Sequence, residues 1–225
     1  IFTEFLLSSK CYNRTMLVTH KYYFLIFLLL LSSPLVISEE NPYIFIDKNA
    51  QIMVKVLEKN KNLFLEDREA YENKIKEIFD PMINFRLVAS NVMGRKHYFA
   101  ASKTQREEFV EIFKDSLLDN YAETLAEFEN LTVTTDFPEV SDYDTSKNIT
   151  VNQTLNTGSS GYPIVYKLRK NTDNKWLIIN IIVQGVNLGT NFRNQFQVLA
   201  NYNNGDIQKT LDGWVLDVEG TGLSG

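Results

Sequence analysis

Apolar residues recur at helical spacing through the first half of the chain. Residues 41–60 repeat apolar side chains every three or four positions behind an Asn-Pro dipeptide, which is a typical helix start. A similar stripe covers about residues 66–80 and ends at Pro81, which disrupts helices. A third stretch, "NFRLVASNVMGRK", reaches Gly94, where a glycine can end a helix in the left-handed conformation. These patterns predict three successive helices.

The longest helical pattern begins at Ser102 and extends to about Glu129. Ser102 and Gln105, three residues apart, form a capping-box signature. The apolar stripe consists of Phe109, Phe113, Leu117, Tyr121, Leu125 and Phe128, and the remaining faces are charged. This spacing fits both a helix packed on a core and the wall of a ligand cavity, and by itself it favours the core helix.

Four later segments read as strands. Residues 131–137, 148–155 and 162–169 alternate apolar and polar positions, as half-buried strands do. The fourth, residues 176–183, is apolar on both faces. Strict alternation places Trp176, Ile178 and Ile182 on one face and Leu177, Ile179, Ile181 and Val183 on the other. We therefore expect this strand at the centre of a sheet or along a cavity.

The order of these elements predicts the fold class. The "NTDN" turn before the fourth strand indicates a hairpin, so neighbouring strands run antiparallel. Helices followed by strands, rather than alternating with them, predict an α+β domain with helices packed on a sheet of about four strands. A chain of 225 residues with 44% hydrophobic content can bury one sizeable core, so we expect a single domain.

The N-terminal region has the layout of a secretory signal peptide. "YYFLIFLLLL" is an almost unbroken apolar run, preceded by His20 and Lys21 and followed by "SSPLVIS". A membrane anchor is the alternative, but residues 22–37 are fewer than the ~20 apolar residues that span a bilayer. We expect export, with cleavage after Ser38.

Three parts of the chain follow from this assignment. Residues 1–38 comprise an upstream extension, residues 1–15, and the cleaved signal peptide. Residues 39–218 form the single folded domain. Residues 219–225, "EGTGLSG", show no periodicity and are predicted to be a disordered tail.

Charge and cysteine content limit the function. The full chain carries −5, and because residues 1–38 hold three basic residues and one acidic residue, the remainder carries −7. Nucleic-acid binding needs a basic footprint, so we exclude nucleic acid as a partner. The only cysteine, Cys11, lies before the cleavage site, which removes disulfides and thiol chemistry from the mature domain. With one histidine left, no metal site is expected.

Enzymatic function has little support in the sequence. His97 is the sole histidine after signal removal, and we expect it to be a solvated residue in a connector. No phosphate-binding loop and no "G-x-S-x-G" or "H-E-x-x-H" motif occurs. We therefore expect no catalytic residues. A pocket enzyme of the ketosteroid-isomerase-like group, with a carboxylate base, stays open as an alternative, as does a periplasmic peptide-binding chaperone.

Three separated motifs carry a family resemblance. "GRKHYFAASKTQREEFVEIFKDSLLDNYAETL", "YPIVYKLRK" and "KWLIINIIVQGVNLGTNFRNQF", in this order behind a signal peptide, resemble the MlaC family of periplasmic phospholipid carriers, also called the toluene-tolerance family. The resemblance extends from about residue 41 to residue 214. It implies an NTF2-like fold, in which helices and a curved antiparallel sheet enclose an apolar cavity for lipid tails.

The resemblance also implies a function. Such a protein binds a glycerophospholipid by its acyl chains and carries it across the periplasm. Its partners are an inner-membrane ABC transporter complex, with a membrane-anchored substrate-binding subunit, and an outer-membrane lipoprotein complex. This transport maintains the lipid asymmetry of the outer membrane. Phospholipid is then the cargo, and no cofactor is expected.

The candidate binding residues follow from this implied cavity. The apolar stripe of the long helix, the fourth strand and the helix after it are expected to line the tails, with Asn187 capping that last helix. The residues are Phe109, Phe113, Leu117, Tyr121, Leu125, Tyr166, Leu168, Trp176, Ile178, Ile181, Val183, Val186, Leu188, Phe192 and Phe196. Head-group selectivity is expected to be weak, because the head group stays at the mouth.

Two further features concern docking. Arg95 and Lys96, in the basic stretch "RKHYFAASK", are candidates for contact with lipid head groups or an acidic docking surface; an exposed connector balanced by nearby glutamates is the alternative. Where relatives have an aspartate, a glutamate and a serine, this chain has Asn180, Gln184 and Asn187. Loss of two carboxylates leaves the strength of docking open.

Overall fold

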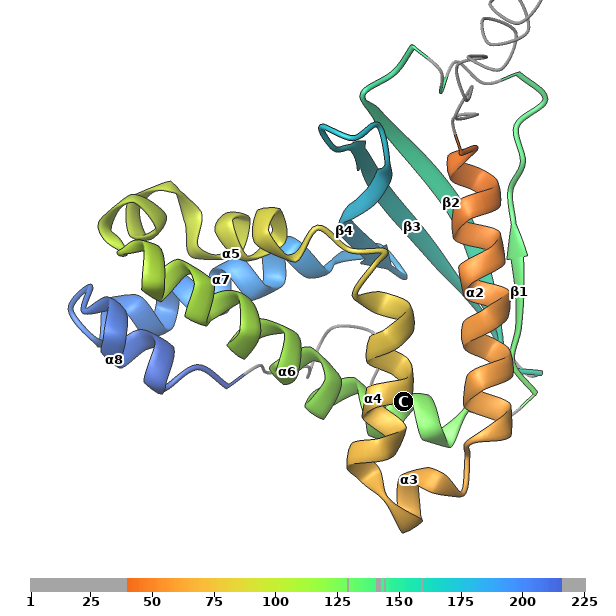
Figure 1. Ribbon diagram of the computed structural model, residues 1–225, viewed down its shortest axis with the longest axis horizontal. Coiled ribbons are helices and arrows are strands. Elements are labelled where there is room, and N and C mark those ends of the chain that lie inside the picture. Colours follow the sequence, from red (N-terminus) through yellow and green to blue (C-terminus); the bar gives the residue numbers. More distant parts are fainter. Residues whose placement is uncertain (1–39, 129, 141–142, 144, 159, 216–225) are drawn as a thin grey trace, which may run out of the picture. The chain divides into compact units, whose positions relative to one another are not determined.

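The computed structural model describes residues 40–128, 130–140, 143, 145–158 and 160–215 (Figure 1). The predicted signal peptide and the predicted disordered tail lie outside these residues. Among the residues that are described, no helix combines the length and the hydropathy that a membrane span requires.

Seven helices belong to the described part of the chain. They are α2 (Pro42–Lys59), α3 (Leu63–Glu66), α4 (Arg68–Phe79), α5 (Phe85–Ala100), α6 (Lys103–Glu127), α7 (Leu188–Tyr202) and α8 (Ile207–Asp212). Local sequence sets several of their starts, as predicted. The Asn41 side chain accepts a hydrogen bond from the Tyr43 amide at 2.9 Å, and Ser102 with Gln105 forms the capping box of α6.

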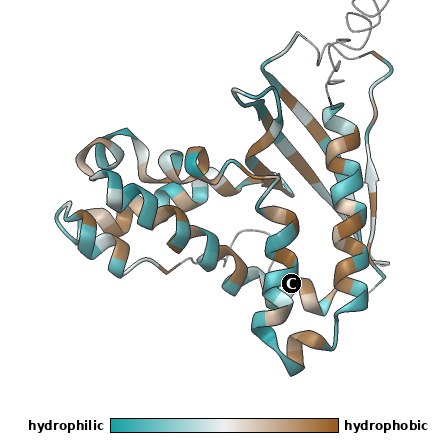
Figure 2. Cartoon of the chain, viewed as in Figure 1, coloured by the Kyte–Doolittle hydropathy of each residue, from teal (hydrophilic) through white to brown (hydrophobic). Residues whose placement is uncertain are grey.

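The strands form one antiparallel sheet in the order of the sequence. They are β1 (Thr132–Thr135), β2 (Asn148–Asn156), β3 (Gly161–Lys170), β4 (Trp176–Val183) and β5 (Val186–Asn187). Hydrophobic and hydrophilic residues alternate along β2 and β3 (Figure 2). The sheet has five strands rather than four, because Gln184 and Gly185, both with positive φ, turn the chain back into the two-residue β5. A strand this short carries no alternation that sequence analysis could detect.

A β-bulge in β4 corrects the predicted faces of this strand. Ile178 pairs with Leu168 and Ile181 pairs with Tyr166, while the register shifts between Lys167 and Leu168. Ile179 is the extra residue, so the alternation reverses there. Trp176, Ile178, Ile181 and Val183 consequently share the inner face of the sheet, which strict alternation had divided between two faces.

The segment after α4 ties the helices to the sheet. The Ile178 amide donates to the Met82 carbonyl at 2.8 Å, and the Asn84 amide donates to the Ile178 carbonyl at 2.9 Å. These bonds occupy part of the β4 edge that would otherwise be open to pairing with another chain. They also fix the position where α4 ends and α5 begins.

Helix α5 differs from its prediction at Gly94. The sequence predicted a helix end there, but helix resumes after a kink at which Gly94 has φ 69° and ψ 162°. A Cβ at this position would lie 3.2 Å from Nη2 of Arg193 on α7, so glycine allows both the turn and the close helix contact.

The kink corrects the expectation for His97. This side chain is 2% exposed, and its ring packs edge-on against Phe196 at 5.8 Å. It is therefore a core residue and not a solvated one. Burial lowers the pKa of His97, which keeps the ring neutral near pH 7.

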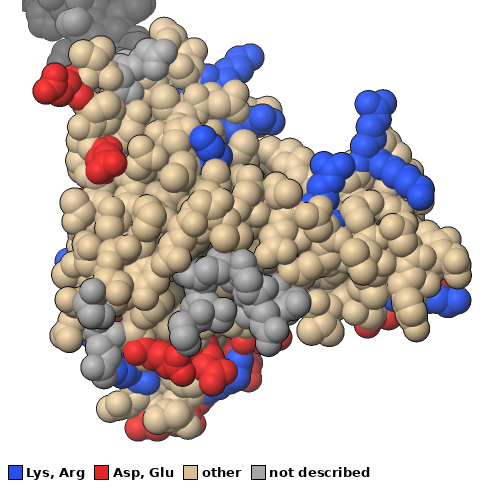
Figure 3. Space-filling model, turned by 180° about the vertical axis from the view of Figure 1, so that it is seen from behind, with Lys and Arg blue, Asp and Glu red and all other residues tan. Residues whose placement is uncertain are grey.

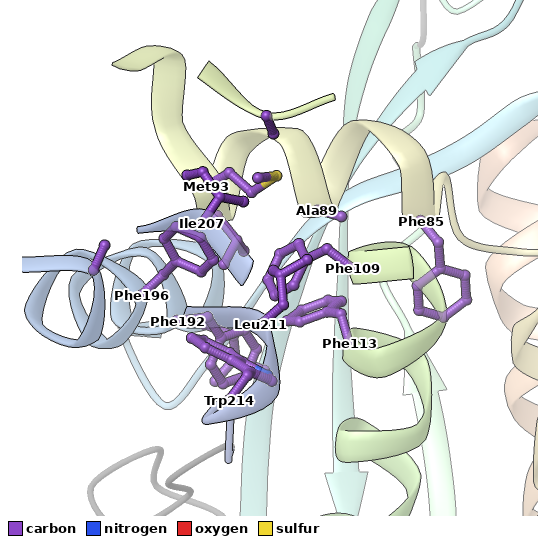
Figure 4. Close-up of a cluster of buried hydrophobic side chains, with 14 of the residues drawn as sticks. Phe85, Ala89, Met93, Phe109, Phe113, Phe192, Phe196, Ile207, Leu211 and Trp214 are labelled. Atoms are coloured by element: carbon purple, nitrogen blue, oxygen red, sulfur yellow. The ribbon is translucent and has the colours of Figure 1, made fainter. Parts of the chain in front are cut away.

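An aromatic cluster joins the first half of α6 to α5, α7 and α8 (Figure 4). Phe109 meets Phe196 at 5.0 Å and Trp214 at 5.4 Å, both edge-on, and Phe113 meets Phe192 at 5.6 Å. Edge-on contacts add to the stabilisation from burial alone. The cluster thus joins two consecutive pairs of helices, α5 with α6 and α7 with α8, that are distant from each other in sequence.

We expect Phe196→Ala to lower the free energy of unfolding by about 3–5 kcal/mol, because it opens a cavity where Phe109, Trp214 and His97 meet. Val198→Ala is the control, since Val198 lies on the same helix and is 70% exposed; its effect should stay within about 0.5 kcal/mol. Urea unfolding followed by tryptophan fluorescence measures both. Equal losses for the two variants would contradict the assigned core.

Candidate functional site

A cavity of about 230 Å³ lies between three helices and the inner face of the sheet. Helices α2, α4 and α6 form one side, and β2, β3 and β4 form the other. Nearly all of its lining side chains are aliphatic or aromatic. A lining of this kind suits an apolar ligand, because such a ligand brings no polar groups that would need hydrogen-bond partners.

Eight of the predicted tail-binding residues line this cavity. They are Leu117, Tyr121, Leu125, Tyr166, Ile178, Ile181, Val183 and Leu188. The bulge in β4 is what brings Ile178 and Ile181 to the same side. Residues from the second half of α6, from two strands and from the start of α7 thus meet in one place.

The other seven predicted residues pack outside the lining. Phe109, Phe113, Phe192 and Phe196 fill the aromatic cluster, and Val186 packs against it. Leu168 and Trp176 are buried in a second cluster, beneath the first turns of α2. The apolar stripe of α6 therefore divides: its first half holds helices together and its second half faces the cavity. Helix α7, expected as a wall, contributes Leu188 alone.

Helices α2 and α4 provide lining that the sequence analysis did not assign. Ala50, Met53 and Leu57 of α2, with Ile75 and Ile78 of α4, line the side opposite the sheet. Their helical stripes were visible in the sequence. No sequence feature of these helices, however, indicated that their apolar stripes face a cavity and not a packed core.

One chain of polar side chains crosses from α2 to the cavity. The Thr135 hydroxyl donates to Asp47 Oδ1 at 2.8 Å, Gln153 Nε2 donates to Thr135 Oγ1 at 2.8 Å, and the Tyr166 hydroxyl donates to Gln153 Oε1 at 3.2 Å. Burial raises the pKa of Tyr166, so this phenol stays neutral and remains a donor. The network fastens α2 to β1, β2 and β3 and pairs the polar groups of Gln153 and Tyr166, which line the cavity.

Two lysines line the cavity where α4 and α6 face each other. Lys76 Nζ lies 3.2 Å from Asp115 Oδ1, and Lys114 Nζ lies 3.6 Å from Asp80 Oδ2. The hydrogen bond with Asp115 raises the pKa of Lys76, so this lysine is charged at neutral pH. Asp80 is also part of the lining, and no other aspartate, glutamate, lysine or arginine is. Charge thus enters the cavity at this one location.

Arg95 and Lys96 lie elsewhere, exposed on the second part of α5 and outside the cavity lining. Lys and Arg side chains gather along the edge of the molecule where α5 lies, whereas Asp and Glu gather towards the end that carries α3 (Figure 3). Helices α5 and α7 contain no acidic residue.

Two of the three amide residues that depart from the family pattern, Asn180 and Asn187, bind each other. Asn180 Nδ2 donates to Asn187 Oδ1 at 2.9 Å, and Asn180 Oδ1 accepts from the Gly189 amide at 3.1 Å. Asn187 caps α7, as predicted, by accepting from the Thr190 amide at 3.0 Å. A Cβ on Gly189 would lie 2.6 Å from Asn180 Oδ1, so a larger residue there would have to displace the Asn180 side chain. The amides therefore hold the β4–α7 junction together.

The described residues contain no group of three or more His, Cys, Asp and Glu side chains arranged to hold a metal ion. Fold and cavity together define the class: an α+β protein with an apolar ligand cavity between its helices and its antiparallel sheet.

Comparison with known proteins assigns the family. The sequence profile of the MlaC protein family matches residues 47–215, and the chain belongs to this family. Over 184 residues it is 29% identical to the toluene tolerance protein ttg2D of Pseudomonas putida, covering 82% of this chain and 84% of that protein. Over 153 residues it is 24% identical to the intermembrane phospholipid transport system binding protein MlaC of Haemophilus influenzae, covering 68% of this chain and 71% of the relative.

A solved structure shares the fold. The phospholipid-binding protein from Ralstonia solanacearum, in complex with a phospholipid, superposes with a TM-score of 0.61 at 22% identity, covering 74% of this chain and 92% of that one. The resemblance drawn from the three motifs and the predicted α+β fold are both confirmed.

We expect Tyr166→Phe to lower the free energy of unfolding by about 1–3 kcal/mol, because Gln153 Oε1 loses its donor in a buried setting. Tyr162→Phe, on the same strand but outside the network and the cavity lining, should change it by less than about 0.5 kcal/mol. Urea denaturation at pH 7 compares the two. A neutral Tyr166→Phe would show that the network does not secure the cavity wall.

Proposed function

We propose that this protein is a periplasmic carrier that binds one glycerophospholipid by its acyl chains and catalyses no reaction. The observation that carries the proposal is the cavity itself, whose lining is mostly apolar. The names of the relatives from Haemophilus influenzae and Ralstonia solanacearum, which refer to phospholipid transport and phospholipid binding, support the choice of cargo.

The energetics of extraction require such a lining. Burying an acyl chain stabilises it by about 0.8 kcal/mol per methylene, and the bilayer already provides this stabilisation. A carrier can remove the lipid at small net cost only if its cavity is nearly as apolar as the membrane interior. Side chains such as Met53, Ile78 and Leu125 meet this demand.

The proposed route runs between two membranes. The chain is exported by its cleavable signal peptide, and it exchanges lipid with an inner-membrane ABC transporter complex and an outer-membrane lipoprotein complex. This exchange maintains the lipid asymmetry of the outer membrane. The membership in the MlaC family supports this route.

The basic surface of α5 and α7 is the proposed docking face. Arg86, Arg95 and Lys96 of α5 and Arg193 of α7 are exposed, and neither helix carries a carboxylate that could neutralise them. Six ion pairs instead join groups of α4, α6 and α8 or their flanking residues. Such a surface attracts an acidic partner and accelerates the encounter.

The alternatives fit this cavity less well. A pocket enzyme of the ketosteroid-isomerase-like group would need a carboxylate base that faces the ligand, and Asp80, a carboxylate of the lining, lies 3.6 Å from Lys114 Nζ in an ion pair. A bound peptide would bring backbone amides that require hydrogen-bond partners. Among the polar groups of the cavity, Gln153 and Tyr166 already bind each other. Both observations favour an apolar cargo.

The first test is native mass spectrometry of the protein purified from a bacterial periplasm without detergent, followed by lipid extraction. We expect about one glycerophospholipid per protein. An empty protein that also takes no lipid from vesicles would overturn the proposal.

Filling the cavity should abolish this binding. Ala50→Trp places a large ring in the lining of α2, so we expect the bound phospholipid to fall at least about tenfold. Ile52→Trp is the matched control, because Ile52 lies on the same helix and outside the lining. Lipid content after incubation with phospholipid vesicles measures both variants. Full binding by Ala50→Trp would place the cargo elsewhere on the protein.

Charge reversal tests the docking face. We expect Arg95→Glu with Lys96→Glu to weaken binding to the membrane-anchored subunit of the transporter by about tenfold or more at low salt, because attraction becomes repulsion. Lys55→Glu, on the exposed side of α2, should have a smaller effect. Biolayer interferometry across a salt series separates the two. An unchanged affinity would exclude α5 from this interface, and lipid loading of the variants serves as the control for folding.

A further inference from the structure

The charges that enter the cavity come from two helices that face each other. Lys76 extends from α4 and Lys114 from α6, and both side chains line the same apolar space. Their side chains are 32% and 18% exposed, so each reaches both the cavity and solvent. This side of the cavity, between α4 and α6, is therefore a place where a lipid can have its tails inside and its polar end outside.

Both lysines form ion pairs that are easily exchanged. The carboxylate of Asp115, at 3.2 Å from Lys76, is 62% exposed, and that of Glu111, at 3.6 Å from Lys114, is 64% exposed. Asp80 also lies 3.6 Å from Lys114. Solvent-exposed pairs of this kind contribute little to stability, and another anion can replace them at small cost.

The setting of the lysines favours a phosphate as that anion. Lys114 Nζ lies 5.2 Å from the centre of the Phe85 ring, so this ammonium group sits against aromatic surface, and both lysines line the apolar cavity. An ammonium group that is partly removed from water attracts an anion more strongly than one in bulk solvent. A phosphodiester presents two acceptor oxygens and a full negative charge, and its hydrogen bonds to ammonium groups are charge-assisted.

We propose that Lys76 and Lys114 form the phosphate subsite of the cavity, where they bind the phosphodiester of a glycerophospholipid whose tails lie between α2, α4, α6 and the sheet. The inference rests on the proposed function and deepens it. Lipid entry breaks the Lys76–Asp115 and Lys114–Asp80 pairs, which join α4 and its C-terminal end to α6, and the phosphate takes their place.

This subsite defines what the protein selects. The phosphodiester is common to all glycerophospholipids, whereas the alcohol beyond it points to solvent. The protein should therefore accept different head groups and discriminate against lipids that have the same tails and no phosphate.

The experiment compares two lipids with identical acyl chains. The lipid-free protein is incubated with vesicles that contain equal amounts of a phosphatidylethanolamine and the matching diacylglycerol, and the lipids bound to the reisolated protein are quantified by mass spectrometry. We expect the wild type to enrich the phospholipid over the diacylglycerol by about tenfold, the size of one or two charge-assisted hydrogen bonds.

Paired variants test the two lysines. Lys76→Gln with Lys114→Gln should lower the enrichment close to the ratio in the vesicles, while uptake of diacylglycerol stays unchanged. Lys103→Gln with Lys209→Gln is the control, because it removes the same charge from positions outside the lining. Lys76→Arg with Lys114→Arg should keep most of the preference, and it distinguishes loss of charge from loss of folding.

The outcomes separate the inference from the function on which it rests. Equal uptake of both lipids by the wild type, or an undiminished preference in the double glutamine variant, would overturn the phosphate subsite and leave the carrier in place. No uptake of either lipid would overturn the proposed function itself.

Discussion

An apolar cavity inside a folded protein is unstable against collapse, and the rest of this structure is arranged to prevent it. Protein interiors pack to high density, and helices with apolar faces close any gap that they can reach. A cavity of about 230 Å³ persists only if its walls are held by contacts outside it. Each of the three helices that cover the sheet has such an attachment.

The three attachments use different chemistry. Helix α2 is bound through the hydrogen-bond chain from Asp47 to Tyr166. The end of α4 is held by the backbone bonds that Met82 and Asn84 form with Ile178. Helix α6 is anchored by its first half in the aromatic cluster with α7 and α8, which leaves its second half to face the cavity. Because these contacts lie in the walls of the cavity or beyond them and none crosses it, the space between the helices and the sheet is free for a ligand.

Most charged side chains are likewise kept apart from the apolar lining of the cavity. Apolar side chains line the cavity, and Lys76 and Lys114 lie at its edge between α4 and α6. The exposed cations of α5 and α7 lie on another surface. Tail burial, contact with the polar end of a ligand and contact with a partner can therefore depend on different residues. A chain with a net charge of −5 nevertheless has a basic face, because its acidic residues are concentrated on other helices.

The sequence by itself determined the features that depend on neighbours in the chain: the caps at Asn41, Ser102 and Asn187, the antiparallel strands, and the motifs that identified the family.

Tertiary structure alone decided which apolar residues face the cavity. Phe113 and Leu117 are one helical turn apart and look alike in the sequence, yet the first packs against Phe192 and the second lines the cavity. The bulge at Ile179 and the position of Lys76 and Lys114 along one cavity were likewise invisible, because register and helix packing are set by residues far away in the chain. Periodicity shows that a face is apolar, but only the positions of the other elements decide whether that face meets a core or a cavity.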